Sequence, residues 1–502
     1  FSLVGKKDKA CVYYDAQDFE VVKTTAGLFA NDVKEVSGQI LGVATTKEAP
    51  QKNCIIVGTL GHNEWIDQMI AKKKLDVEPL KDRWESYLVQ LVRNPLPGVD
   101  KALVIVGSDR RGAAYGLLSV SRTIGVSPWY WWADAPIVKK DQLHLKVDKY
   151  ISKEPTVKYR GIFINDEDWG LYRWSKRNFE KEVGNFGPRT YAKVCELLLR
   201  LQANYLCPAM HDASMAFHRI PENRVVADRF AIIMGSSHCE PLLFNTASEW
   251  KRDKMGEWDY INNKKGVDSV LNARVKECAP FENVYTLALR GLHDAAMGGG
   301  DVPMREKVKM LESALNAQRD IIARHIDKPV ETIPQAFTPY KEVLEIYSNG
   351  LELPDDVFGY MKRLSGPQEQ KRSGRAGVYY HISYLGVPHS YLWYSTTPPA
   401  LMYEELRKAY DTTADRVWLA NCGDLKGAET QIYDIDSFNA DNVATYPARW
   451  LAKMFGEEYY DTLEDITCSH INLAFSRKPE YMGWGYWNNY WGGGEKRTDT
   501  EF

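Results

Sequence analysis

Short apolar runs rich in β-branched residues alternate along this chain with amphipathic segments of helical length. In residues 1–150 the runs CVYY, CIIVGTL and ALVIVGS are typical of buried strands, and helical segments fall between them. Asp109 can cap a helix that runs to about Ile124, because Gly125 and Pro128 follow it. Residues 1–150 are therefore predicted to form a small N-terminal α/β domain.

Strand-like and helix-like segments alternate from residue 151 to residue 434, which is typical of βα units around a parallel sheet. The predicted strands are RGIFIND, ANYLCPAM, AIIMGSS, VYTLALRG, TIPQAF, GVYYHIS and RVWLANCGD. The predicted helices span 191–201, 267–278, 304–325, 340–347 and 399–410. A TIM barrel needs eight strands, and only a stub from Leu353 to Val357 stands where the eighth belongs. We still expect a TIM (β/α)8 barrel, and the predicted fold class is α/β.

Residues 435–502 turn helical, with two paired helices expected at 439–455 and 457–475. The tail that follows is rich in Gly and Trp and has no closing element. We interpret 435–502 as the start of a C-terminal helical region, in a chain that is truncated before a further domain.

Composition narrows the class of partner. The net charge of -3 gives no electrostatic case for nucleic acid, and no apolar run approaches the roughly 20 residues that span a bilayer. The 15 Trp and 29 Tyr residues suit sugar faces, although most are expected in cores. The cluster Trp129–Trp132 either forms a sugar platform or packs between domains, and we expect the second. Eight scattered Cys residues without a CxxC pair predict buried thiols rather than a structural zinc site or a disulfide framework.

Polar residues gather where the predicted strands end. In VYTLALRGLHD, a cation, an imidazole and a carboxylate (Arg290, His293 and Asp294) follow an apolar run. Similar groups follow the other strands: Asn165, Asp166, Glu167, Asp168, His211, Asp212, His238, Glu240, Tyr340, Glu342, His381, Tyr384, Asn421 and Asp424. The carboxyl ends of barrel strands face one mouth, so these residues predict a polar pocket.

Carboxylates, imidazoles and aromatic rings without metal spacing favour a glycosidase, which needs two carboxyl groups, one of them protonated. Arg290 would bind a substrate carboxylate and so indicate a uronic acid, or it would pair with Asp294 or Glu342 and hold the site in shape. Three alternatives stay open: a hydrolase of the same architecture for another sugar, such as a hexosaminidase-like enzyme, a catalytically inactive glycan-binding protein, and a metalloenzyme built on His238, His293 and His381.

Several longer motifs place the chain beside a known family: IVGSDRRGAAYGL, KYRGIFINDEDWGL, MGSSHCEP, RGLHD, PYKEVLEIY, GVYYHISYLG and RKPEYMGWGY. Together they resemble family 115 of the glycoside hydrolases, the α-glucuronidases. The resemblance implies an inverting two-carboxylate enzyme without cofactor or metal. Its substrate would be a plant polysaccharide or oligosaccharide decorated with glucuronic acid or its 4-O-methyl ether, such as glucuronoxylan or arabinogalactan.

The resemblance also implies an N-terminal α/β domain, a TIM-barrel catalytic domain, a helical region and a C-terminal β-sandwich, before which this chain stops. The substrate class predicts a periplasmic or secreted protein. The oligomeric state stays open between a monomer and a homodimer.

Carried over residue by residue, the family pattern predicts a site whose proton donor and base are not assigned by the sequence. The catalytic pair is Asp294 and Glu342. The substrate-binding residues are Asn165, Asp166, His238, Arg290, Tyr340, His381 and Tyr384.

The chain departs from the family pattern at one point. Family members carry a strand and a Trp-Pro-Asp-Asp-Asn motif after the segment that matches Leu353 to Val357, whereas here Val357 runs directly into Phe358. Either these residues belong to the protein but are missing from this sequence, or the protein lacks them. We expect the first, because a barrel without one strand should not close. The second would remove an acidic site residue and would favour the inactive binder.

Overall fold

The computed structural model describes residues 1–6, 8–165, 170–297, 302–359, 364–382, 397–423, 425 and 443–476. The chain divides into two compact units. The first unit comprises Phe1–Lys158, Ala192–Asn204 and Val225–Ile232, and the second comprises Tyr159–Tyr191, Tyr205–Arg224 and Ile233–Phe502. Both contain helices and strands, so the predicted α/β class is confirmed. The domain boundaries expected from the sequence stay predictions, and residue 434 lies outside the described residues.

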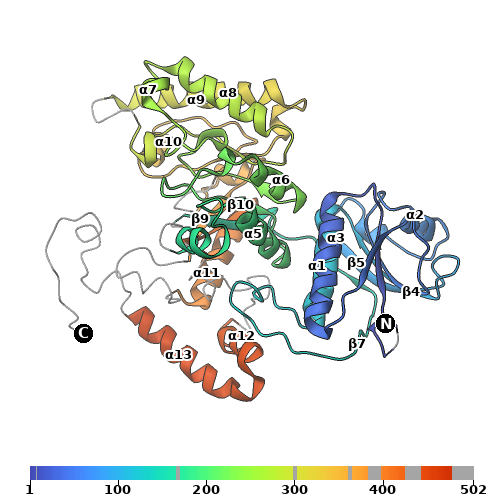
Figure 1. Ribbon diagram of the computed structural model, residues 1–502. Coiled ribbons are helices and arrows are strands. Elements are labelled where there is room, and N and C mark those ends of the chain that lie inside the picture. Colours follow the sequence, from blue (N-terminus) through green and yellow to red (C-terminus); the bar gives the residue numbers. More distant parts are fainter. Residues whose placement is uncertain are drawn as a thin grey trace. The chain divides into compact units, whose positions relative to one another are not determined.

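A six-stranded sheet organises the first unit (Figure 1), in the order β3-β2-β4-β6-β5-β8. Its strands are β3 Gly42–Thr45, β2 Cys11–Tyr14, β4 Asn53–Thr59, β6 Lys101–Gly107, β5 Tyr87–Arg93 and β8 Tyr150–Ile151. The first four run parallel, whereas β5 is antiparallel to both β6 and β8. The predicted strands are β2, β4 and β6. Strands β3, β5 and β8 were not predicted, because their apolar runs are short or interrupted by polar residues. A separate two-stranded sheet pairs β1 (Ser2–Val4) with β7 (Leu143–His144).

Helices cover both faces of this sheet: α1 (Glu20–Ser37) and α3 (Arg110–Ile124) lie on one face, and α2 (Glu64–Ala71) lies on the other (Figure 1). The predicted cap of α3 is confirmed, since Asp109 accepts hydrogen bonds from the backbone N–H groups of Arg111 and Gly112. A Cβ on Gly112 would lie 2.2 Å from the Ser86 carbonyl oxygen. Glycine at this position therefore allows α3 to lie directly on the start of β5.

The aromatic cluster after α3 is buried within the first unit. Trp129 and Trp132 have almost no exposed surface, and the Trp132 indole N–H donates to the Lys193 carbonyl oxygen at 3.2 Å. A buried ring offers no face to a sugar, so the platform alternative is wrong for these two rings.

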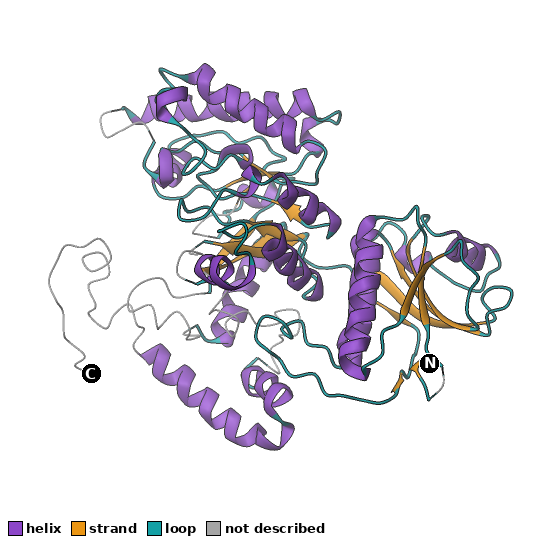
Figure 2. Ribbon diagram, viewed as in Figure 1, coloured by secondary structure: helices purple, strands orange, loops and turns teal. Residues whose placement is uncertain are grey.

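Among the described residues of the second unit, eight short strands, all paired in parallel, lie among the helices that Figure 2 shows. One sheet has the order β11-β10-β9-β16-β15 and the other β12-β13-β14. The strands are β9 Tyr159–Ile164, β10 Tyr205–Cys207, β11 Ile233–Met234, β12 Tyr285–Thr286, β13 Gln335–Phe337, β14 Phe358–Gly359, β15 Gly377–His381 and β16 Val417–Gly423. Single parallel bridges, Met234 to Asn283 and Gly359 to Ala376, connect the edges of the two sheets. Each of the seven predicted runs overlaps one of these strands.

The helices of the second unit are α4 Leu171–Trp174, α5 Pro188–Arg200, α6 Pro221–Arg229, α7 Arg252–Met255, α8 Lys264–Cys278, α9 Met304–His325, α10 Glu342–Ser348, α11 Pro399–Asp411, α12 Tyr446–Phe455 and α13 Tyr460–Ser476, although α5 and α6 each contribute residues to the first unit as well. The long predicted helices of the second unit are present, whereas the short helices α4, α6 and α7 were not predicted. Residues 439–442 of the predicted terminal helices lie outside the described residues. None of the helices described combines the length and the apolar character needed to cross a membrane.

The missing strand is the clearest correction to the sequence analysis. Leu353–Val357 form no strand, but the next two residues form β14, whose Phe358 is paired with Ala336 and whose Gly359 is paired with Phe337. Phe358 is buried and its ring stacks on that of Tyr159 at 5.7 Å. A strand therefore occupies this place without further residues. The argument that residues must be missing because the sheet cannot form without them is accordingly wrong.

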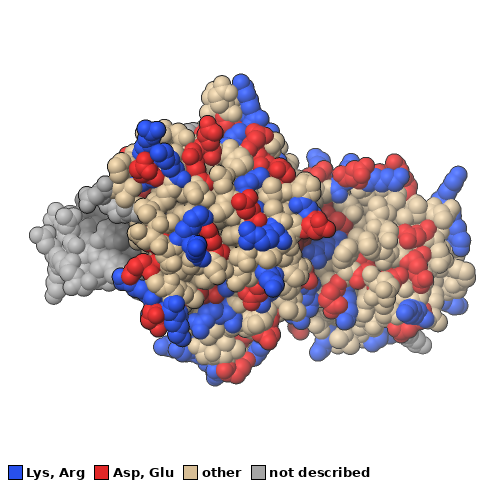
Figure 3. All heavy atoms as spheres, turned by 90° about the horizontal axis from the view of Figure 1, so that it is seen from above, with Lys and Arg blue, Asp and Glu red and all other residues tan. Residues whose placement is uncertain are grey.

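The prediction of buried thiols is confirmed for seven of the eight cysteines. Seven of the eight thiols are buried, Cys468 is exposed, and all eight are free. The described surface mixes both signs of charge: Lys and Arg are interspersed with Asp and Glu over the face in Figure 3, as the small net charge suggests.

Gly161 fixes the distance between β9 and β10. The two residues Gly161 and Tyr205 are paired in register, and a Cβ on Gly161 would lie 1.6 Å from the Tyr205 carbonyl oxygen. Gly161→Ala is therefore expected to lower the free energy of unfolding by about 3 kcal/mol, because backbone must shift to make room. Urea unfolding measures the effect.

Gly27→Ala is the matched control for this substitution. A Cβ there meets nothing within 4 Å on α1, so alanine should raise the free energy of unfolding by about 0.4–1 kcal/mol. Equal effects of the two substitutions would contradict the close approach of β9 and β10.

Candidate active site

Five predicted site residues come together at the carboxyl ends of three neighbouring strands. His238 follows β11, Arg290 and Asp294 follow β12, and Tyr340 and Glu342 follow β13. Parallel strands bring their carboxyl ends to one edge, which explains why residues about 50 positions apart in sequence lie in contact.

Arg290 is the centre of the cluster. Its side chain is only 2% exposed, and it donates from Nε to Glu342 Oε1 at 3.1 Å and from Nη2 to Glu342 Oε2 at 2.7 Å. Its Nη1 forms an ion pair with Asp294 Oδ1. One guanidinium thus neutralises both predicted catalytic carboxylates, which is the shape-holding role considered from the sequence. Trp258 donates its indole N–H to the Arg290 carbonyl oxygen at 2.6 Å and fixes the backbone of this residue.

Asp294 has two further partners. His238 Nε2 lies 2.7 Å from Asp294 Oδ1, and the Lys341 ammonium donates to Asp294 Oδ2 at 2.7 Å. Burial, followed by the charges of Arg290 and Lys341, lowers the pKa of His238 to about 3, so the imidazole is neutral at ordinary pH. A neutral imidazole can donate to an ionised Asp294 or accept from a protonated one, depending on its tautomer. His238 can therefore hold Asp294 in either protonation state.

Glu342 is held in its ionised form. Burial by itself would raise its pKa, but hydrogen bonds from the Arg290 guanidinium and from the Met297 backbone N–H at 3.1 Å outweigh it, so the pKa lies below the usual value. Two carboxylates in one cluster thus have different surroundings. Both accept from Arg290, but Asp294 also contacts the His238 imidazole and the Lys341 ammonium, whereas the partners of Glu342 among the described residues are the Arg290 guanidinium and the Met297 N–H.

The backbone is strained at this site. His293 and Asp294 have φ of 51° and 68°, and Lys341 has φ 53° with ψ -128°, in regions that side chains rarely adopt. Such strain concentrates at functional sites, where surrounding contacts impose it. Here it turns the side chains of Asp294 and Lys341 toward each other.

Two predicted residues lie at the ends of the five-stranded sheet. Asn165 follows β9 and donates its backbone N–H to the Gly423 carbonyl oxygen at 2.8 Å. His381 ends β15 in register with Asn421 of β16. They lie at the same edge, on either side of β16, and the backbone of each pairs with this strand. The predicted residues Asp166 and Tyr384 lie outside the described residues.

Lys341 is the site residue that the sequence analysis missed. It stands between Tyr340 and Glu342 in PYKEV. Its ammonium donates to Asp294 and lies 5.2 Å from the centroid of the Tyr340 ring. Its charge was the only available signal. A lysine at the start of a predicted helix usually faces solvent, so the sequence pattern favoured the wrong interpretation.

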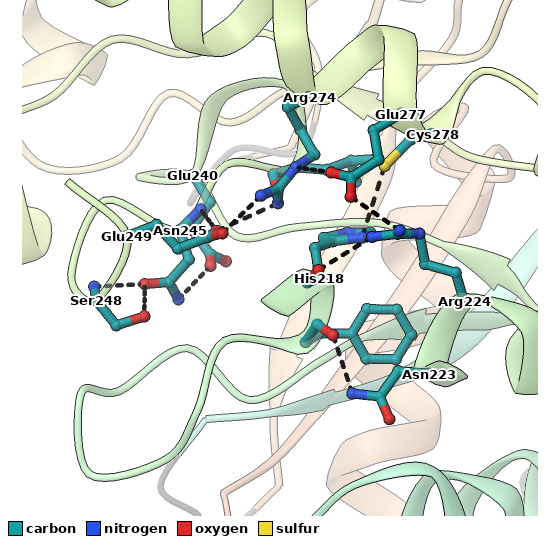
Figure 4. Close-up of polar contacts among 12 residues, drawn as sticks. His218, Asn223, Arg224, Glu240, Asn245, Ser248, Glu249, Arg274, Glu277 and Cys278 are labelled. Carbon is teal, nitrogen blue, oxygen red and sulfur yellow. Dashed lines mark hydrogen bonds and ion pairs between the residues drawn. The ribbon is translucent and has the colours of Figure 1, made fainter. Parts of the chain in front are cut away.

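Glu240 belongs to a buried polar network beside the site (Figure 4) rather than to the site itself. It accepts from the Ser237 backbone N–H at 3.0 Å and from Asn245 Nδ2 at 2.8 Å. The network continues from Asn245 to Glu249, which pairs with Arg274 at 2.6 Å. These contacts hold the turn that carries His238.

One group of side chains among the described residues has the spacing of a metal site. His238, Cys239 and Asp294 offer ligand atoms within 4.8 Å of one another. Burial raises the pKa of the Cys239 thiol to about 12, with a smaller contribution from Glu240, so the thiol is protonated and a poor ligand. His293 and His381 are not in this group, so the geometry does not favour the proposed three-histidine metal site.

The pH dependence of stability should reveal Glu240. Burial raises its pKa from 4.5 to about 7 in the folded protein. The folded state therefore binds the proton of Glu240 more tightly than the unfolded chain does. This proton binding adds roughly 3 kcal/mol to the free energy of unfolding below about pH 4.5. The added stability is lost as pH rises through about 7. In Glu240→Gln the fall in unfolding free energy over this window should be absent, as measured by urea unfolding at several pH values.

The control for Glu240→Gln is Glu222→Gln, which alters an exposed residue of α6. This variant should keep the wild-type slope. A wild-type slope in Glu240→Gln would show that Glu240 is not the titrating group.

Comparison with known proteins assigns the chain to a family. A profile of Glycosyl hydrolase family 115 matches residues 152–481. The chain belongs to glycosyl hydrolase family 115. Among solved structures this family 115 chain is similar to BtGH115A, a 4-O-methyl-alpha-glucuronidase with specificity for decorated arabinogalactans, with 37% identity and a TM-score of 0.87. The match covers 97% of this chain and 64% of BtGH115A, so the chain spans less than two thirds of that protein.

More distant structures share the fold alone with the family 115 chain. A GH138 enzyme targeting pectin rhamnogalacturonan II is 10% identical with a TM-score of 0.52, over 92% of this chain and 55% of the other. The Flavobacterium johnsoniae chitobiase FjGH20 is 11% identical with a TM-score of 0.50, over 94% and 72%. No curated protein matches the chain.

Proposed function

We propose that the protein is an α-glucuronidase that removes glucuronic acid or its 4-O-methyl ether from a plant polysaccharide. Membership of family 115 and the similarity to BtGH115A support the class of reaction. The observation that carries the proposal is the buried Arg290, which holds Asp294 and Glu342 together while His238 contacts Asp294. This arrangement supplies two carboxyl groups with different environments, as glycoside hydrolysis requires.

In this mechanism Asp294 is the proton donor and Glu342 activates water. Glu342 suits the base because its hydrogen bonds from Arg290 and Met297 keep it ionised. Asp294 suits the acid because the neutral imidazole of His238 can accept a hydrogen bond from the protonated carboxyl before the proton passes to the leaving oxygen. With water attacking from the opposite side, the reaction inverts the anomeric configuration.

Lys341 provides the contact for the uronate. Its side chain is 48% exposed, whereas the Arg290 guanidinium is buried and already carries two carboxylates. Arg290 then keeps the two catalytic groups in place, and Lys341 recognises the uronic acid.

The wider architecture of this proposal is a TIM (β/α)8 barrel. Two observations support it. The strands pair in parallel in the orders β11-β10-β9-β16-β15 and β12-β13-β14. The bridges from Met234 to Asn283 and from Gly359 to Ala376 connect these two sheets. A polysaccharide substrate further suggests that the protein works in the periplasm or outside the cell.

Product analysis tests the proposal. The protein is incubated separately with decorated arabinogalactan and with glucuronoxylan, with and without a chelator, and the products are separated by anion-exchange chromatography. Release of glucuronic acid or its methyl ether is expected from at least one polysaccharide, unchanged by the chelator. Release that the chelator abolishes would contradict the metal-free mechanism.

A glycan-binding protein without activity is the second candidate. The absence of the Trp-Pro-Asp-Asp-Asn motif between Val357 and Phe358 favours it, because this sequence then lacks the acidic residue that the family resemblance implies for the site. Binding of the same polysaccharides without any released sugar would establish this candidate and refute the hydrolase.

A further inference from the structure

A cavity of about 480 Å³ opens on the first unit, on the sheet face that α1 and α3 cover. Its walls come from β5 and β6, from α3, from residues 145–148, from Tyr150 of β8 and from residues 199–202. The volume falls within the range of roughly 300–1,000 Å³ found for small-molecule sites. None of the site residues described above lines it.

The floor of the cavity is aromatic and rigid. Tyr87 is 4% exposed, and its ring lies 5.8 Å from that of Tyr150, which is 54% exposed. A Cβ on Gly116 would lie 3.1 Å from Tyr87 Cδ2, so α3 presses directly on the Tyr87 ring and fixes it. The cavity thus offers an accessible tyrosine ring supported by a buried one, a surface that suits the apolar face of a sugar.

The rim of the cavity is polar and carries cations. Lys146, Asp148, Thr123, Gln202 and Arg122 all line it. Arg200 also reaches the cavity, but its charge is used by a two-point contact with Asp32 at 2.9 Å and by Glu196 at 2.9 Å. Lys146 is exposed and has no ion pair among the described residues, so its ammonium is available to an anionic ligand.

We propose that this cavity is a second glycan site, which binds a uronic acid residue of the polysaccharide. The apolar face of the sugar lies on Tyr150, its carboxylate binds Lys146, and its hydroxyls bind Thr123 and Gln202. The choice of a uronic acid follows from the cation beside an exposed aromatic ring. The proposal rests on the proposed function only for the polysaccharide that supplies the sugar. Such a site would hold decorated chains without taking part in their hydrolysis.

Hydrogen–deuterium exchange tests the proposal in the full chain. An Asp294→Asn background slows turnover of the probe, which is glucuronic acid linked to xylobiose. We expect this probe to slow exchange at 115–123 and 145–150, and xylobiose to leave these segments unchanged. Lys146→Glu and Tyr150→Ala alter exposed side chains. Each should raise by about tenfold the probe concentration that gives half of the full protection. Lys153→Glu, an exposed lysine outside the cavity, should retain it.

Each outcome decides between the two proposals. Absence of protection at 115–123 and 145–150, or equal protection by the neutral disaccharide, would overturn the uronate site. Protection that survives both cavity substitutions would overturn it as well. Product release by the wild-type protein without cavity protection refutes only the second site. Cavity protection without product release refutes the hydrolase and leaves the second site intact.

Discussion

Asp294→Asn should lower the rate of glucuronic acid release by about 10²–10⁴-fold, the usual contribution of a general acid. The amide fills the same space and can still contact His238 and Lys341, but it has no proton to give to the leaving oxygen. Asparagine is also among the side chains that tolerate positive φ, so the fold should survive at residue 294, where φ is 68°. The kcat on the released uronic acid is the measurement.

The matched control is Asp253→Asn, which makes the same chemical change on an exposed residue of α7. It should leave kcat unchanged. Near wild-type turnover in Asp294→Asn would remove Asp294 from the chemistry and leave Glu342 as the first candidate for the proton donor.

Arg290→Met should impair both folding and activity. The substitution leaves two partly buried carboxylates, Glu342 and Asp294, without the cation that pairs with both. Breaking a buried ion pair by removing one partner costs about 3–5 kcal/mol, to be measured by urea unfolding. Loss of the guanidinium also leaves burial to raise the pKa of Glu342, so the acidic limb of the pH–rate profile should move to higher pH.

Arg319→Met separates these two effects. Arg319 makes a similar two-point contact with Asp356, at 2.8 and 3.2 Å, in a largely buried setting away from the site. This control should lose stability but keep the wild-type pH–rate profile. A shifted profile in the control, or an unshifted one in Arg290→Met, would refute the assignment of Glu342 to the acidic limb.

Long periodic segments made most of the fold predictable. The helix predicted at 304–325 has these bounds in the structure as α9, because a 22-residue amphipathic stretch has many apolar positions that agree on one face. The cap at Asp109 was equally predictable from local chemistry. Strand β14 was not predictable, because the two residues Phe358 and Gly359 are too few to show an alternation of apolar and polar positions. They form a strand because β13 and Ala376 lie on either side of them.

The site could be predicted as a set of residues but not as a set of contacts. The strand-end rule brought His238, Arg290, Asp294, Tyr340 and Glu342 together, because parallel strands share one carboxyl edge. The rule gives no information about pairing across strands, so it left open whether Arg290 binds the substrate. It also passed over Lys341, whose direction depends on a backbone conformation that the sequence does not specify.

The positive-φ backbone of the site has a consequence for protein engineering. Strain of this kind costs about 1–3 kcal/mol per residue, so glycine at position 341 should make the protein more heat-resistant while removing the ammonium that meets the uronate. A selection for thermal tolerance alone would therefore accept substitutions in the site that remove its function. Libraries meant to yield a more durable catalyst should keep residues 293, 294 and 341 fixed.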